Sequence, residues 1–401
     1  MKRSGTADLA LQGGRIPPWL FSRMKQLSLP IVESIIQEYG TAHFLSKMSD
    51  PYWFQSFGAV IGMDWNSSGV TTAIMRALKE AVNPHSRQLG IYICGGKGKE
   101  STMTPNELLM VGDQTGLNGN ELAYASKLSA KVDNTALQDG FNLYLHSFIL
   151  DAKGEWTVVQ QGMNPHNNKA RRYHWHSKNV KSFIEDPHAA VCGEYQGEIL
   201  NLVDSNAKST QDAIIQISQE NPVKILAEIP HMKLPSYQKV KSSDVDLRRL
   251  GSVLYLAGEL ETNSFEDLLM LQGVGPRTIQ SLTLVSEVIH GTPSRFTDPA
   301  RFAFAHGSKN GHPFAVPTKI YDESVTVLKN AVEKSRIGNS DKAKAIKSLS
   351  KIAERLEKSF TPNDDFDKVL ADQKRQASQL GARQVNHKKS KNKGGNQLDL
   401  F

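Results

Sequence analysis

The spacing of apolar residues changes along the chain and divides it into two parts. Over Phe141–Leu150 and Glu155–Met163, apolar and polar residues tend to alternate, which predicts two strands joined by a four-residue turn. Beyond Ser243, apolar residues recur every three or four positions, the spacing of amphipathic helices. We therefore expect an α+β fold. A mixed α/β domain at residues 1–236 would carry the hairpin in its sheet, and an all-helical domain at residues 237–360 would follow.

Local capping residues and apolar runs predict further elements in both parts. A short β-like run ends in glycines, and several helical patterns begin at serines or end at glycine or Asn-Pro. The expected strand is residues 89–94, and the expected helices are residues 69–82, 245–257, 319–335 and 341–359.

The hairpin places polar side chains on an otherwise apolar ribbon. If Leu150 pairs with Glu155, antiparallel register puts Tyr144 opposite Gln161. Because side chains alternate between the faces of a strand, Tyr144, His146 and Gln161 would then share one face. Buried polar groups need partners, so we expect this face to lie near a functional site.

Two aspartates just before the hairpin are the main candidates for hydrolytic chemistry. A nuclease needs carboxylates to hold Mg²⁺ or Mn²⁺, and often a histidine to handle the proton of the attacking water. The sequence therefore predicts Asp133 and Asp139 as metal ligands and catalytic residues, joined by His146, Gln161 and His174. Each residue taken alone is also compatible with a role in a cap or turn.

Zinc is not expected. The possible ligands His174, His176, His188 and Cys192 have a spacing that matches no standard structural zinc site.

Cations alternate with aromatic residues between Asn164 and Lys181. Lysine and arginine neutralise phosphates while aromatic faces stack on bases, so this mixture is typical of a nucleic-acid groove. The alternative is a solvated loop around one buried tryptophan. The candidate DNA contacts are Lys169, Arg171, Arg172, Tyr173 and Trp175.

A glycine hairpin between two predicted helices, at residues 264–271 and 276–290, is the most specific local motif. It would turn the first N–H groups of the second helix outward, where they can hold a phosphate oxygen. Glycine also lets a nucleic-acid backbone come close. The predicted DNA contacts are Gly273, Val274, Gly275, Arg277 and Thr278.

The string LLMLQGVGPRTIQSL resembles the helix-hairpin-helix motif of DNA glycosylases, ligases and repair nucleases. Gln272 replaces the usual proline, and Ile279 stands where alanine is common. In glycosylases with this motif, a lysine and a later aspartate do the chemistry. Arg277 occupies that lysine position, and Asp298 lies too far along. The resemblance therefore implies DNA binding and disfavours lyase-type glycosylase chemistry, with an ordinary αα-hairpin as the alternative.

The amino-acid composition changes again near the C-terminal end of the chain. Residues 361–396 have the composition of a flexible basic linker, yet the chain ends on apolar side chains. The last five residues resemble the peptide with which bacterial replication and repair proteins bind the sliding clamp. Exposed apolar anchors are explained by a partner groove, although folding back onto the protein's own surface is the alternative. The predicted clamp-binding residues are Gln397, Leu398, Asp399, Leu400 and Phe401.

Charge and composition indicate where in the cell the protein is expected to work. The chain has 48 Lys and Arg against 41 Asp and Glu, a net charge of +7, and residues 361–401 hold eight of the former and five of the latter. No apolar run approaches the roughly 20 residues that span a bilayer. Two cysteines, Cys94 and Cys192, fit a reducing compartment. We expect a cytoplasmic, nucleoid-associated protein without a membrane partner.

Long strings also support a family resemblance over residues 1 to about 340. They are GTADLALQGG, PYWFQSFGAVIGMDWNSSGVTT, AKVDNTALQDGFNLYLHSF, WTVVQQGMNPHNNKARRYHWHS and FTDPARFAFAHGSKNGHPF. The chain resembles the family called domain of unknown function 763. This resemblance implies a shared architecture and no particular activity.

Together these patterns favour a DNA-binding protein of repair or replication, with a metal-dependent nuclease as the leading hypothesis. The expected partners are DNA and the sliding clamp, and the expected cofactor is Mg²⁺ or Mn²⁺. A non-enzymatic DNA-structure binder that serves as a clamp adaptor is the rival hypothesis. A glycosylase that activates water through Asp298 is a third, and the oligomeric state stays open.

Overall fold

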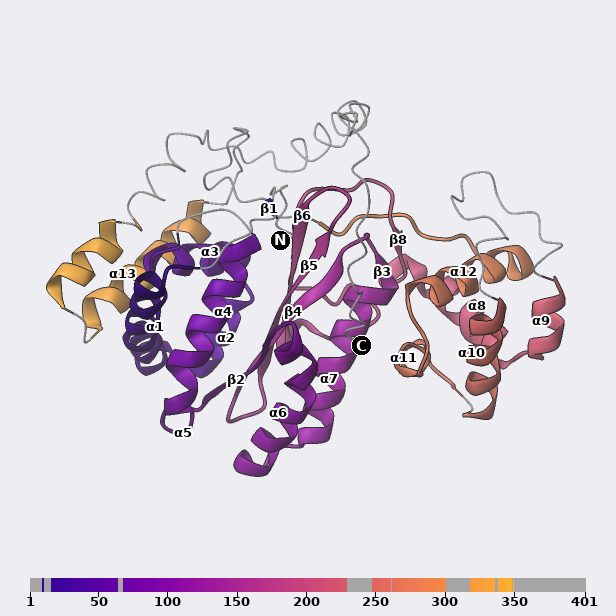
Figure 1. The fold of residues 1–401 in the computed structure, drawn as a ribbon, viewed down its shortest axis with the longest axis horizontal. Coiled ribbons are helices and arrows are strands. Elements are labelled where there is room, and N and C mark those ends of the chain that lie inside the picture. The colour runs from indigo at the N-terminus through magenta and orange to yellow at the C-terminus, as the bar shows by residue number, and fades with distance from the viewer. Residues whose placement is uncertain are drawn as a thin grey trace.

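A computed structural model describes most of the chain up to residue 349. The described residues are 9–10, 16–63, 68–228, 247–260, 262–300, 318–335, 338–347 and 349. They form an antiparallel sheet flanked by helices, which confirms the α+β class (Figure 1). The predicted linker, the clamp peptide and the 236/237 domain boundary lie outside the described residues.

The main sheet has six strands, and every neighbouring pair is antiparallel. Its order is β1-β6-β5-β4-β2, with β7 beside β6. These strands are β1 Leu9–Ala10, β2 Ile91–Lys97, β4 Asn142–Asp151, β5 Trp156–Asn164, β6 Lys169–His176 and β7 Ala190–Cys192. A second, two-stranded sheet pairs β3 Leu137–Gln138 with β8 Leu200–Asn201.

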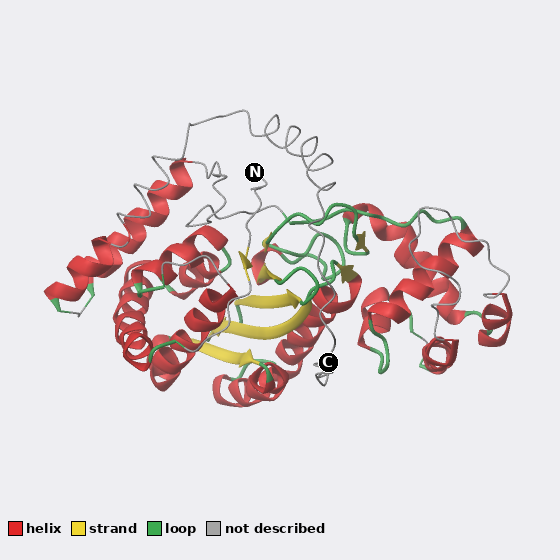
Figure 2. Ribbon diagram, turned by 45° about the horizontal axis from the view of Figure 1, so that its top comes forward, coloured by secondary structure: helices red, strands yellow, loops and turns green. Residues whose placement is uncertain are grey.

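Helices cover both faces of the main sheet (Figure 2). One face packs against the N-terminal helices, and α13 lies on α1 and α3. These helices are α1 Pro18–Tyr39, α2 Thr41–Met48, α3 Pro51–Val60, α4 Ser68–Val82, α5 Ser86–Leu89 and α13 Thr318–Lys334. The other face packs against α6 Lys99–Thr115 and α7 Gly119–Lys131, and α7 continues into a π-helical turn, Val132–Ala136.

The hydrophobic core on the α6–α7 side continues into the second half of the chain. There α8, α10, α11 and α12 pack against one another and against α7 and the π-helical turn. Their bounds, with α9, are α8 Lys208–Gln219, α9 Pro222–Glu228, α10 Leu247–Glu259, α11 Phe265–Met270 and α12 Pro276–His290. After α12 the chain returns to the sheet region, where Phe296 forms a bridge with Leu200.

The predicted hairpin forms from β4 and β5, but its register differs by one residue from the prediction. Leu150 pairs with Trp156 rather than with Glu155. The physical reason lies in Asp151, whose Oδ1 accepts hydrogen bonds from the N–H groups of Lys153 and Glu155. The Asp151 N–H also donates to the Glu155 carbonyl at 2.9 Å. Asp151 and Glu155 therefore lie opposite each other, and the turn between the strands is one residue shorter than predicted.

A bulge between Leu143 and Leu145 also changes which side chains share a face. Tyr144 lies on the side of Gln161, whose Nε2 donates to the tyrosine hydroxyl at 2.6 Å. His146 pairs with Gln160 and points to the opposite side, where its Nε2 lies 2.8 Å from the Ser126 hydroxyl of α7. The prediction that His146 shares a face with Tyr144 and Gln161 is therefore wrong.

Candidate functional site

The first candidate site is a buried polar network between the sheet and α7. Asp133 lies in the π-helical turn and is fully buried. Its Oδ2 accepts from Gln160 Nε2 at 2.7 Å and from Trp175 Nε1 at 2.9 Å, and its Oδ1 lies 2.5 Å from His188 Nε2. Burial raises the pKa of Asp133, and His188 opposes that shift. The carboxylate thus joins two strands and a loop.

A second buried carboxylate, Asp139, belongs to a separate group around Arg171. Its Oδ2 accepts from Arg171 Nη1 at 3.0 Å and from the Tyr173 hydroxyl at 2.7 Å. Arg171 also donates to both oxygens of Asp298, at 3.0 and 2.7 Å. Burial raises the pKa of Asp139 to about 6, while the positive charge of Arg171 opposes that shift. One guanidinium therefore joins β6 to the segment that follows α12.

The arrangement of Asp133 and Asp139 does not fit a shared divalent-metal site. Every carboxylate oxygen already accepts from a side chain or backbone N–H, including the Phe141 N–H on Asp139 Oδ1. Within the described part of the chain, no group of three or more His, Cys, Asp or Glu side chains could hold a metal ion. A cation at either aspartate would have to displace these donors.

The remaining predicted catalytic residues lie on different sides of the sheet. His146 shares the α7 side with the two aspartates, and burial lowers its pKa to about 4. Gln161 and His174 lie on the other side, where Gln161 Nε2 donates to the Ser68 carbonyl of α4 and His174 Nδ1 lies 3.1 Å from the Met48 carbonyl. The structure therefore divides the five predicted catalytic side chains into two groups separated by the sheet.

His174 forms part of a second buried polar cluster. Arg172 Nε lies 2.9 Å from His174 Nε2, and the guanidinium packs 4.6 Å from the Phe54 ring centroid. Arg172 Nη1 also donates to the Thr71 hydroxyl at 3.2 Å. Burial and the adjacent guanidinium together hold the pKa of His174 well below its usual value. His174 is therefore neutral and accepts a hydrogen bond at neutral pH.

Most of the basic and aromatic residues between Asn164 and Lys181 lie in strand β6, Lys169–His176, rather than in a surface groove. Four of the five predicted contacts have no exposed surface: Arg171, Arg172, Tyr173 and Trp175. The fifth, Lys169, keeps a partly exposed side chain and pairs with Glu194 at 2.5 Å. The expected surface groove is therefore wrong, because these side chains face the core and hold partners there.

The second candidate site is the hairpin between α11 and α12, and it faces solvent. Ser264 caps α11 by accepting from the Asp267 N–H at 3.0 Å. Gly273 has a φ of +85°, a conformation that favours glycine, and Val274 is 3% exposed. Gly275 supplies no side-chain cap to α12, and Arg277 is exposed. Uncapped N–H groups and an exposed cation thus lie at one helix end.

Thr278 differs from the other predicted hairpin contacts. Its side chain is 4% exposed, and its hydroxyl lies 3.4 Å from the Gly273 carbonyl. The threonine therefore packs beneath the hairpin and helps to hold the turn.

Two residues that the sequence did not single out fix the hairpin to the first half of the chain. Lys131 Nζ, at the end of α7, donates to the Val274 carbonyl at 2.8 Å. Gln138 Nε2, in β3, donates to the Pro276 carbonyl at 2.8 Å. Both contacts join residues about 140 positions apart, so no local pattern could have predicted them. They determine how the hairpin is oriented relative to the sheet.

Comparison with known proteins gives a family. A family model described as "Protein of unknown function (DUF763)" matches residues 5–316, which confirms the resemblance seen in the sequence strings. Neither the curated proteins nor the solved structures contain a match to the chain. In the described ranges, the helices are too short or too polar to cross a bilayer.

Proposed function

The chain belongs to the DUF763 family of proteins of unknown function, and from its geometry we propose that it binds the sugar–phosphate backbone of DNA through the α11–α12 hairpin. The observation that carries this proposal is the exposed glycine turn, which has Val274 buried beneath it and the uncapped start of α12 beside it. The proposal is that the chain binds DNA, and DNA cleavage is treated as a separate question below.

The chemistry of the hairpin suits a phosphate group. The first N–H groups of a helix have no intrahelical acceptor, and the helix dipole adds partial positive charge there. Gly273 and Gly275 have no side chain to block a phosphate oxygen, and Arg277 supplies a full positive charge in the first turn of α12. Contacts of this kind hold DNA without reading its sequence.

The setting in repair or replication is proposed from the C-terminal peptide. Gln397 to Phe401 resemble a ligand of the bacterial sliding clamp, and a basic linker joins them to the family region. A clamp contact at the end of a linker would raise the local concentration of the hairpin at DNA. Deleting residues 397–401 should abolish clamp binding and leave intrinsic DNA affinity unchanged. Clamp affinity that survives the deletion would refute this part.

Between the enzymatic and non-enzymatic versions, the buried network favours the binder. Asp133 and Asp139 are fully hydrogen-bonded inside the protein, and the catalytic candidates Gln161 and His174 lie on the other side of the sheet. Incubation with labelled single-stranded, duplex and branched DNA, with Mg²⁺ or Mn²⁺, separates the two versions. Cleavage that depends on the added metal would establish the nuclease instead.

The binding proposal is tested with two hairpin variants and a matched control. Arg277→Ala removes one phosphate contact, so affinity for a labelled duplex should fall roughly tenfold and the salt slope should decrease by about one. Gly275→Leu adds bulk at a residue with an extended backbone, φ −142°, and should weaken binding without changing the charge. Arg248→Ala removes an exposed arginine from α10 and should have little effect.

Fluorescence anisotropy over a range of salt concentrations gives the affinity for DNA and its salt slope, and circular dichroism checks that each variant folds. Equal losses for Arg277→Ala and Arg248→Ala would show that binding depends on general charge. Full affinity in both hairpin variants would refute the proposal.

A further inference from the structure

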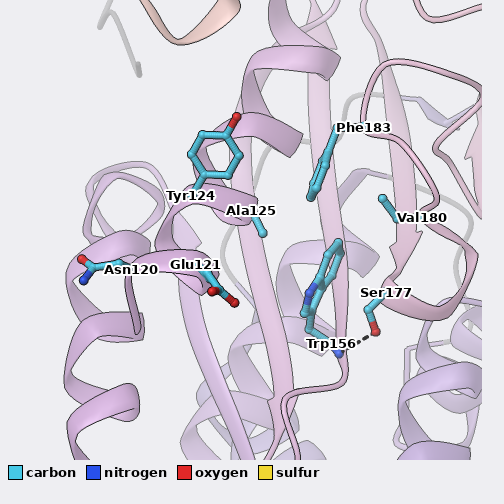
Figure 3. Close-up of a pocket in the computed structure, with 8 residues that line it drawn as sticks. All are labelled: Asn120, Glu121, Tyr124, Ala125, Trp156, Ser177, Val180 and Phe183. Atoms are coloured by element: carbon cyan, nitrogen blue, oxygen red, sulfur yellow. Dashed lines mark hydrogen bonds between the residues drawn. The ribbon is translucent and has the colours of Figure 1, made fainter. Parts of the chain in front are cut away.

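A groove lined by aromatic side chains lies between α7 and the segment that follows β6. It encloses about 560 Å³ and is open to solvent. Tyr124 contributes from α7, Trp156 from the start of β5, and Phe183 from the loop after β6 (Figure 3). These residues are far from one another in sequence and meet only in the fold.

The aromatic rings of the groove are held in place. Trp156 and Phe183 stack with centroids 6.1 Å apart and 20° between their planes, and Phe148 packs behind Trp156 at 5.1 Å. The Trp156 backbone N–H donates to the Ser177 hydroxyl at 3.0 Å. Tyr124 lies across the groove and is 36% exposed. The groove therefore exists before any ligand arrives.

Acidic side chains surround these rings. Glu121 lines the groove, and Glu266 of α11 accepts a hydrogen bond from the Phe183 backbone N–H. Burial raises the pKa of Tyr124, and the negative charges of Glu266 and Asp267 raise it further. Among the described residues that line the groove, none is a lysine or arginine. Two exposed lysines, Lys178 and Lys181, directly follow the lining residues Ser177 and Val180, and Lys178 pairs with Glu155 at 2.9 Å.

Aromatic faces and carboxylates together select a particular ligand. The face of an aromatic ring attracts cations, and a nearby carboxylate adds attraction. The same carboxylates repel phosphates, so a nucleic-acid strand is a poor match although its bases could stack. The geometry points to a binding site for an alkylammonium group, supplied by a lysine side chain of a protein partner. The groove is lined from α7, β5 and the loop after β6, and it borders the DNA-binding hairpin through Glu266 of α11.

The site is tested with small amides rather than with an unknown partner. Saturation-transfer NMR would compare Nα-acetyl-lysine methylamide, its trimethylammonium form and Nα-acetyl-norleucine methylamide, which has a similar length and no charge. Both cations should bind at least roughly fivefold more tightly than norleucine, because cation–π attraction requires the charge. The ratio of the affinities for the two cationic amides shows whether the site favours a methylated lysine.

Variants locate the site. Tyr124→Ala and Glu266→Gln should each weaken binding of the cations roughly fivefold and leave norleucine unaffected. Tyr255→Ala, which removes a 51% exposed tyrosine from α10, is the matched control and should change nothing. Equal binding of all three amides, or cation binding that Tyr124→Ala leaves intact, would overturn the proposal. Tighter binding of a single-stranded oligonucleotide to the same groove would overturn it as well.

Discussion

Strand β6 and helix α12 both carry arginines that the sequence analysis predicts to contact DNA, yet the arginines of β6 are buried and the arginine of α12 is exposed. Arg171 and Arg172 of β6 have no exposed surface, whereas Arg277 of α12 faces solvent. Arg171 is neutralised by two carboxylates, and Arg277 lies beside helix N–H groups that carry partial positive charge. A buried arginine with ionic partners stabilises structure, while an exposed arginine beside uncapped N–H groups suits an external anion.

The comparison is tested most strongly at Arg171. Arg171→Met should lower the free energy of unfolding by about 3–5 kcal/mol, because it leaves the Asp139 and Asp298 carboxylates buried without their counter-charge. Urea denaturation followed by circular dichroism measures the loss. Lys169→Met in the same strand removes a partly exposed ion pair and should cost less than about 1 kcal/mol.

Neutralising the carboxylates supplies the matched test. Adding Asp139→Asn and Asp298→Asn to Arg171→Met should restore part of the lost stability, since the repulsive buried charges are then gone. A triple variant less stable than Arg171→Met alone would show that the arginine acts through packing rather than through charge.

The next largest effect concerns His146 and pH. Burial lowers its pKa to about 4 in the folded protein, against an ordinary histidine pKa of 6.5. Between these values only the unfolded chain takes up the proton, so the contribution of His146 to stability is present above pH 6.5 and is lost as the pH falls to 4. The stability advantage of the wild type over His146→Gln should shrink by about 3 kcal/mol across this range.

Denaturation at a series of pH values measures that difference. Asp139, whose pKa is raised to about 6, acts in the opposite sense, and it is present in both proteins, so it cancels from the comparison. A constant difference between wild type and His146→Gln from pH 7 to pH 4 would show that His146 titrates normally and is accessible to solvent.

The smallest effect concerns the attachment of the hairpin. Lys131→Met removes the hydrogen bond to the Val274 carbonyl and should destabilise the protein by about 1 kcal/mol. Hydrogen exchange should then be faster at the start of α12 than in β5. Lys127→Met, which changes an exposed lysine one turn earlier on α7, should leave exchange unchanged. Equal exchange in both variants would show that Lys131 does not hold the hairpin.

Elements set by neighbouring residues could be predicted from the sequence. Pro276 and Gly291 fix the ends of α12, which runs from residue 276 to residue 290 as expected, and α4 begins within one residue of its predicted start. Ser264 caps α11 through Asp267 for the same reason. Caps and turns are decided by contacts over three or four positions, so a local pattern contains them.

The interior of the sheet could not be predicted in this way. The string KARRYHWH predicts a nucleic-acid groove, but it forms the buried strand β6, in which Arg171 is neutralised by Asp139 and Asp298, which lie 32 and 127 positions away. The side chain of Asp151 shifts the register of the hairpin by one residue. The bulge at Tyr144 places the side chains of Tyr144 and His146 on opposite faces of the sheet. Each of these outcomes depends on a partner or an irregularity that apolar spacing does not encode.

The long separation between Arg171 and Asp298 has a consequence for how the chain is made. During synthesis, β6 leaves the ribosome well before the carboxylate that completes the neutralisation of its arginine. The sheet can collapse early on its apolar residues, but a buried guanidinium with only part of its counter-charge is costly. Completion of the core therefore waits for the segment after α12, so a fragment that ends before residue 298 should be a poor folding unit.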